Sequence, residues 1–80
     1  MKAKVYITLK KSVMDPQGAA VIHSLEAMNY SGVQDVRIGK MIEVGFDDKL
    51  DKAKAEKQLT DMCDKLLANP VIEDYRFEFI

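Results

Sequence analysis

Apolar and polar residues alternate at both ends of the chain. Between Lys2 and Lys10 every second residue is apolar, and the residues between them are mostly polar. From Glu73 to Ile80 the same alternation places three aromatic residues on one face. A period of two is typical of a strand that buries one of its faces. The pattern therefore predicts a first strand and a last strand at the two ends of the chain.

A helix is predicted after the first strand, because Asp15 followed by Pro16 forms a helix start. An N-cap aspartate accepts hydrogen bonds from free backbone N–H groups, and proline suits the first helical position. Residues at helical spacing then share one face, namely Gly18, Val21, Ile22, Leu25 and Met28. This face is expected to pack on a sheet, with Gly18 allowing a close approach, and the helix is expected to end between Asn29 and Gly32.

Residues 36–46 carry apolar side chains at even positions, with Lys40 as the exception. A two-residue hairpin turn at Gly39 and Lys40 would move Glu43 onto the apolar face. A three-residue loop from Gly39 to Met41 would keep the face intact, and so would one continuous strand. We favour one long strand, bulged if at all at Gly39, whose eleven residues reach ~35 Å and can pair with another subunit at one end.

A second helix is predicted from Asp51, an N-cap residue, to about Ala68. Its apolar stripe consists of Ala55, Leu59, Met62, Cys63 and Leu66. Asn69 is expected to end the helix because the following Pro70 disfavours helical geometry in the residue before it. The element order predicts one α+β domain over residues 1–80. It is a strand-helix-strand-helix-strand two-layer sandwich, in which an antiparallel sheet with a long central strand carries two helices on one face and dimerises through the sheet.

The size of the chain predicts a partner. A domain of 80 residues buries little apolar surface relative to the chain entropy that it loses, so small domains usually depend on disulfides, a metal or another subunit. The single cysteine, Cys63, excludes an internal disulfide. Association with itself or with other chains is therefore the expected source of the missing stability.

Charge and hydropathy exclude two classes of partner. Twelve Lys and Arg residues against thirteen Asp and Glu residues give a net charge of −1, which offers no field for a phosphate backbone, so nucleic acid is not expected as a partner. The chain runs from Met1 directly into the first strand, with no apolar signal segment and no run long enough to span a bilayer. We expect a cytoplasmic protein that does not bind membranes.

The residues that usually carry chemistry are few and scattered. His23 falls on the polar side of the first helix, and Cys63 on the apolar stripe is interpreted as a small buried hydrophobe. One cysteine and one histidine cannot supply a zinc site, and the glycines match neither nucleotide-binding spacing. We predict no catalytic residue, no metal ligand and no cofactor site. Met28 and Met62 are expected in the core, and Met41 is expected to be exposed at a contact.

Two places in the chain could bind an anion. Arg37, Lys40 and Lys49 could contact an anionic ligand, but Arg37 and Lys40 have opposite strand parity, so a solvated sheet face is favoured. The helix start at Asp15 could instead receive a carboxylate or phosphate at an exposed helix N-terminus. The structural interpretation, a plain helix start, is favoured there too.

Three segments carry a family resemblance: Asp15-Pro16-Gln17-Gly18, Arg37-Ile38-Gly39-Lys40, and Leu66-Leu67-Ala68-Asn69-Pro70-Val71-Ile72-Glu73-Asp74-Tyr75. Together they closely resemble the PurS family, the smallest subunit of bacterial and archaeal phosphoribosylformylglycinamidine synthase. The similarity spans nearly the whole chain, and the third segment is the most specific. One departure is the helix ending Met28-Asn29-Tyr30, where the family has Leu-Gly-aromatic, and asparagine can adopt the same left-handed cap.

The resemblance implies a role in purine biosynthesis. In that step formylglycinamide ribonucleotide, glutamine and ATP give formylglycinamidine ribonucleotide (FGAM), glutamate, ADP and phosphate. The family places this chemistry in a glutaminase subunit and in a large synthetase subunit that binds ATP and magnesium. The chain itself would be a non-catalytic, dimeric adaptor that joins them and aids ammonia transfer. Its candidate partner contacts are Asp15, Pro16, Gln17, Arg37, Gly39, Lys40, Asn69 and Pro70.

Two rival functions fit an α+β chain of this size. A small-molecule-sensing domain of the ACT type also dimerises edge to edge, and it would bind an amino acid or a purine. An acylphosphatase-like enzyme would need a phosphate-cradling loop with an arginine, and the loop between Leu9 and Asp15 has none. The adaptor interpretation is therefore favoured, with the ACT-like domain as the alternative.

Overall fold

The computed structural model describes residues 1–80. Strand β1 (Lys2–Leu9) is followed by helix α1 (Pro16–Ala27), strand β2 (Gly39–Gly45) and helix α2 (Lys52–Met62). Helix α2 continues into a single π-helical turn, η1 (Cys63–Leu67), and strand β3 (Glu73–Phe79) completes the chain. The predicted α+β class and element order are confirmed.

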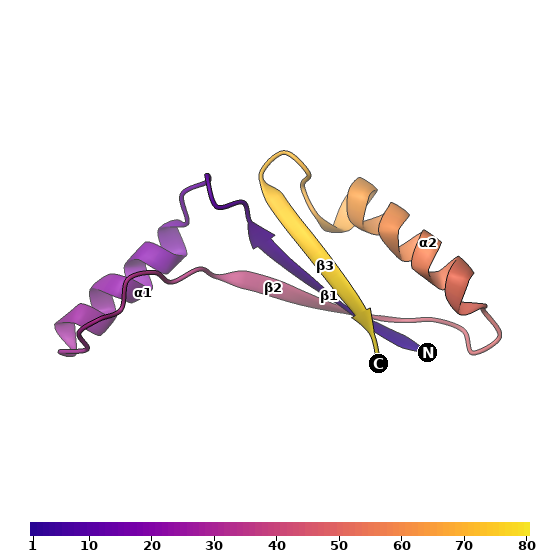
Figure 1. The fold of residues 1–80 in the computed structure, drawn as a ribbon, viewed down its shortest axis with the longest axis horizontal. Helices are drawn as coiled ribbons and strands as arrows, with labels where there is room; N and C mark the ends of the chain where they lie inside the picture. The colour runs from indigo at the N-terminus through magenta and orange to yellow at the C-terminus, as the bar shows by residue number, and fades with distance from the viewer.

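The three strands form one antiparallel sheet in the order β2-β1-β3, with β1 in the centre (Figure 1). Val5 of β1 lies opposite Ile42 of β2 and Phe77 of β3. Residues opposite one another in antiparallel strands share a face of the sheet. The apolar positions of all three strands therefore form one continuous face, as the alternation of the sequence predicts.

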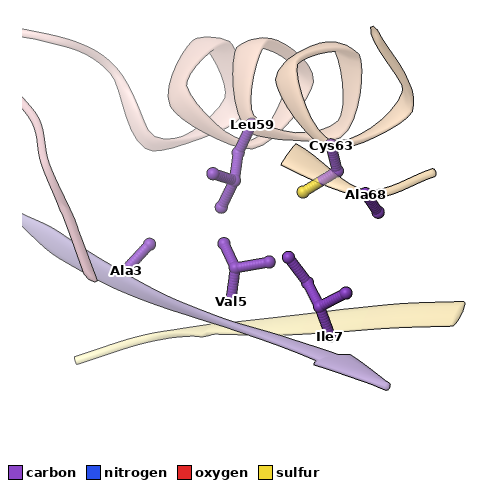
Figure 2. Close-up of a cluster of buried hydrophobic side chains, with 6 residues drawn as sticks. All are labelled: Ala3, Val5, Ile7, Leu59, Cys63 and Ala68. Atoms are coloured by element: carbon purple, nitrogen blue, oxygen red, sulfur yellow. The ribbon is translucent and has the colours of Figure 1, made fainter. Parts of the chain in front are cut away.

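Helix α2 and turn η1 cover this face. Leu59 and Cys63 point from the helix toward Ala3, Val5 and Ile7 on β1 (Figure 2). These five side chains are at most 1% exposed. The aromatic face of β3 packs around them, with Phe77 and Phe79 edge to face at 6.1 Å between ring centroids. This apolar contact between β1, α2 and η1 holds α2 against the sheet.

The end of α2 differs from the predicted stripe. In η1 the N–H of Ala68 donates to the carbonyl of Cys63 at 3.0 Å, which is the wider i→i+5 spacing of a π-turn. The extra residue rotates Leu66 away from the sheet, and its side chain is 80% exposed. The prediction that Leu66 is buried is therefore wrong. Asp51 occupies the N-cap of α2 as predicted, but its side chain makes no capping hydrogen bond.

Helix α1 lies beyond the end of the sheet, beside the extended segment that leads back to β2 (Figure 1). The Cα radius of gyration is 16.4 Å and the extents are 52 × 25 × 15 Å, whereas a compact domain of this length has a radius of about 12 Å. Within one chain, only α2 of the two helices covers the sheet. Met28, which was predicted in the core, is 63% exposed for this reason.

Strand β2 is a single strand, so the hairpin alternatives at Gly39 are excluded. Ile42 and Val44 lie opposite Val5 and Ala3, which preserves the predicted parity. The strand is shorter than the predicted 36–46 and lies at the edge of the sheet rather than in its centre. Its pairing with β1 starts at Gly39 opposite Thr8. Residues before Gly39 have no neighbouring strand in the same chain because β1 ends there.

Truncation of the core tests this packing. Leu59→Ala should lower the free energy of unfolding by about 2–5 kcal/mol, because it removes a fully buried side chain from the interface between α2 and the sheet. Leu66→Ala is the matched control, and it should change the free energy by less than about 0.5 kcal/mol. Urea unfolding followed by circular dichroism measures both. Equal losses from the two variants would contradict the described π-turn.

Candidate functional site

The Asp15 carboxylate joins two segments that are far apart in the sequence. Its Oδ1 accepts the N–H of Gly18 at 2.9 Å, and its Oδ2 accepts the N–H of Ile38 at 2.7 Å. The first bond is the predicted N-cap of α1, which is confirmed. The second bond reaches the residue before β2. The side chain is only 7% exposed, so the carboxylate is satisfied internally by the backbone.

Hydrogen bonding holds the pKa of Asp15 below its usual value. The N–H of Gly18 makes the largest contribution, followed by the N–H of Ile38, while burial acts in the opposite direction. The nearby positive charge of Arg37 lowers the pKa further. Bonds to the charged form favour ionisation, so Asp15 is an anion at neutral pH.

Arg37 also stabilises this region through hydrogen bonds to the backbone. Its Nη2 donates to the carbonyl oxygens of Lys10 and Val13 at 2.9 and 2.8 Å. Both acceptors belong to the turn that connects β1 to α1. The guanidinium group, considered for anion binding from the sequence, therefore bonds to the protein's own backbone.

Gly18 is the point of closest approach between α1 and the segment before β2. A methyl group at this position would lie 1.9 Å from the carbonyl oxygen of Val36, which no side chain can adopt without displacing the backbone. The close approach predicted for Gly18 is present. Its neighbour is the returning chain segment rather than the sheet.

A hollow of about 400 Å³ opens at this end of the sheet. Its apolar residues are Ile7, Leu9 and Ile38. Five of the predicted contact residues meet here, namely Asp15, Pro16, Gln17, Gly39 and Lys40. Glu73 also lines the hollow, and no sequence pattern predicts this position because it depends on the pairing of β3 with β1.

Asn69 and Pro70 belong to a separate, internally bonded loop. The Asn69 side-chain oxygen accepts the N–H of Val71 at 3.0 Å, and Glu73 Oε1 accepts the N–H of Asn69 at 2.7 Å. The loop is also tied to the end of β1, because Lys10 donates its N–H to the carbonyl of Ile72 at 2.8 Å. Its tip presents Val71, which is 78% exposed. The sequence indicated the loop but not this exposed apolar residue.

The remaining groups suggest structural roles. Cys63 is buried in the core, and burial raises the pKa of its thiol. The Tyr75 hydroxyl donates to Asp64 at 2.9 Å, and this bond raises the pKa of the tyrosine. No three side chains of His, Cys, Asp or Glu are grouped as a metal site would require. None of the helices has the length and apolar character needed to cross a membrane. Met41 is 51% exposed, as predicted.

A protein-family model described as PurS, phosphoribosylformylglycinamidine (FGAM) synthase, matches residues 2–80. The chain belongs to the PurS family. The resemblance carried by the three sequence segments is thus confirmed, and so is the fold that it implies.

Several PurS proteins are close relatives. The phosphoribosylformylglycinamidine synthase subunit PurS of Bacillus subtilis is 56% identical over 77 residues, which cover 96% of this chain and 89% of the relative. The crystal structure of Methanocaldococcus jannaschii PurS is 38% identical, with a TM-score of 0.83 over 96% of this chain and 92% of that one. A chain in the structure of PurLQS from Thermotoga maritima is 30% identical, with a TM-score of 0.82 over 99% and 95% of the two chains.

The pKa of Asp15 predicts acid sensitivity of the fold. A depressed native pKa stabilises the folded state above the unfolded value, and this contribution is lost as the pH falls through the native pKa. The difference in unfolding free energy between the wild type and Asp15→Asn should therefore be constant near neutrality and should shrink from about pH 4 downward. Asp51→Asn is the matched control at neutral pH, because the Asp51 side chain makes no capping bond, and this variant should lose less unfolding free energy than Asp15→Asn. Urea unfolding across pH measures both, and identical profiles for the two variants would contradict the assignment.

Proposed function

We propose that this chain is a non-catalytic adaptor subunit of an FGAM synthase complex in purine biosynthesis. The observation that carries the proposal is membership of the PurS family over residues 2–80. It is supported by the Bacillus subtilis relative, named as a subunit of this synthase, and by the fold match to a chain of PurLQS. The partners are a glutaminase subunit and a large synthetase subunit, which holds the ATP and magnesium. The complex works in the cytoplasm, and ammonia passes between its subunits.

The second part of the proposal is a homodimer. Five of the eleven exposed large apolar residues fall within residues 21–38, namely Val21, Met28, Tyr30, Val33 and Ile38. Such a concentration of exposed apolar side chains is typical of an interaction surface. The segment lies beyond the end of its own sheet (Figure 1), and these side chains remain 36–63% exposed.

The same chain also carries a surface that fits this segment. The hollow at the end of the sheet exposes Leu9 and Ile38 beside α1, and residues before Gly39 have no strand neighbour. A second copy related by a two-fold axis would cover both the exposed segment 21–38 and the hollow, because each chain then covers the other's apolar surface. In this dimer, α1 of one protomer covers the sheet end of its partner and supplies the second helix of the sandwich.

Five of the eight predicted contact residues divide between two surfaces in this proposal. Pro16, Gln17 and Lys40 contact the second copy at the hollow. The loop around Asn69 and Pro70, with exposed Val71 at its tip, is left to the glutaminase and synthetase subunits. Hydrogen bonds within the loop restrict its conformation, so its apolar surface loses little conformational entropy when a partner binds.

Reconstitution tests the adaptor function. Synthetase and glutaminase subunits from the same source should form FGAM from glutamine and ATP only when this chain is added. Ammonium supplied directly to the synthetase should bypass the requirement, because the ammonia then needs no second subunit. The rates are measured with and without the chain, and co-migration is followed on a sizing column. Full glutamine-dependent activity without the chain, together with no co-migration, would reject the function.

Charge placed on α1 tests the dimer. Val21→Glu puts a carboxylate on the apolar face of α1 and should raise the dimer dissociation constant by at least about ten-fold. Ala20→Glu is the matched control, since it adds the same charge at an adjacent, exposed position of the same helix, and it should leave the dimer intact. Sedimentation equilibrium measures both. A monomeric wild-type chain, or equal effects of the two variants, would contradict the proposed dimer.

A further inference from the structure

Residues 16–38, which we call the arm, leave the sheet and return to it at one place. The arm consists of α1 and the extended segment that follows it; it begins after the turn that follows β1 and ends just before β2. These strand ends are neighbours, because Thr8 lies opposite Gly39. Figure 1 shows the arm as a long projection from that point. Its direction is therefore decided at its base.

The bonds at this base converge on one carboxylate. Asp15 accepts one N–H from the outgoing side of the arm, at Gly18, and one from the returning side, at Ile38. Gly18 lies so close to Val36 that a methyl group could not fit between them. Arg37 adds two bonds to the turn before the arm. The two sides of the arm are thus held together where they meet the sheet.

We propose that Asp15 is a positioning residue for assembly: by bonding Gly18 and Ile38 together, it sets the direction of the arm and presents the apolar face of α1 to a second copy. This inference rests on the dimer of the proposed function. It goes further by naming the group that arranges the surface before the partner arrives.

Helix capping alone does not explain this arrangement. An N-cap needs one acceptor oxygen, and α2 forms although Asp51 at its N-cap makes no side-chain bond. The second oxygen of Asp15 contributes nothing to α1 itself, because it accepts from a residue 23 positions away in the sequence. Its effect is to bind the returning side of the arm to the outgoing side.

A fixed arm strengthens association because less freedom is lost on binding. If the arm swings about its base, each chain must order it before the apolar face meets the sheet end of the partner. Loosening the base should therefore weaken the dimer without altering the exposed apolar residues of α1 that meet the partner. This separates the positioning role from direct contact.

Asp15→Asn tests the role with little change in shape. The amide oxygen can still cap Gly18, since asparagine caps a helix as well as aspartate does. The amide nitrogen, however, places a donor against the N–H of Ile38 and cannot accept it. Asp51→Asn is the matched control, at an N-cap whose side chain makes no bond. Arg37→Lys is a second variant, which keeps the charge but loses the planar fork that bonds Lys10 and Val13.

We call the two bonds from Asp15 to Gly18 and Ile38 the clamp. Two measurements test the clamp and the dimer separately. Amide hydrogen exchange of Ile38 is measured in the Val21→Glu background, so that loss of protection reports on the arm and not on the second copy. The dissociation constant is measured in the otherwise unaltered chain by sedimentation. Asp15→Asn should speed Ile38 exchange by at least about ten-fold and raise the dissociation constant by at least about ten-fold. Helix content should stay unchanged. Arg37→Lys should act in the same direction, and Asp51→Asn should change neither value.

Any result other than these would contradict one specific part of the proposal. Unchanged Ile38 exchange in both Asp15→Asn and Arg37→Lys contradicts the clamp. Faster exchange with an unchanged dissociation constant contradicts the link to assembly. Loss of α1 helix content in Asp15→Asn would show that the residue acts as a cap only. A monomeric wild-type chain would refute the proposed dimer and this role within it. That result is told apart from failure of the clamp because Ile38 exchange is read in a monomeric background.

Discussion

The carboxylate of Asp15 accepts an N–H group on each side of the arm, and the shape of the chain depends on these two bonds. They bring the start of α1 against the segment before β2, where Gly18 and Val36 meet with no room for a side chain. With its base held in this way, α1 extends past the sheet instead of folding over it (Figure 1). The apolar face of the sheet is then covered by α2 alone, and the apolar face of α1 is left uncovered.

The elements were largely predictable because their signals are local. Period-two alternation located β1 and β3, and Asp15 with Pro16 located the start of α1. Asn29, with φ of 68°, adopts the left-handed conformation expected at the helix end. The failures have non-local causes. Leu66 is exposed because a π-turn shifts the helical phase. The residue pattern does not predict such a turn. An amphipathic stripe also predicts that a helix face is buried, but it does not predict whether the sheet of the same chain covers that face. For this reason the exposure of Met28 and the position of α1 beyond the sheet were not predicted.

The candidate site was predictable in part for the same reason. Asp15, Gly39 and Lys40 were singled out from the sequence, and they line one hollow. Arg37 was considered for anion binding, but it bonds the backbone of the turn before α1, a partnership that depends on tertiary proximity. Leu66 and Val71 are two of the most exposed apolar residues. Leu66 was assigned to the buried stripe of the second helix, and no sequence pattern indicated the exposure of Val71.

These features fit an adaptor subunit. Its core is a single small cluster on one side of the sheet, and its buried cysteine is part of that core (Figure 2). Seven of its eleven exposed large apolar residues lie on the arm and on the loop before β3. In the proposed assembly the arm joins two copies, and the loops remain free to bind the larger subunits. The function of the chain then follows from the surfaces that its fold leaves uncovered.

The central claim is that a second copy covers the arm. An isotope-filtered NOE experiment on an equal mixture of ¹³C-labelled and unlabelled chains tests it most directly, because it detects only contacts between different chains. The proposed dimer should give intermolecular NOEs from the side chains of Ile22 and Leu25 on α1 to those of Leu9 and Ile38 at the end of the other sheet. NOEs from these α1 side chains only to residues of their own chain would contradict the proposed dimer.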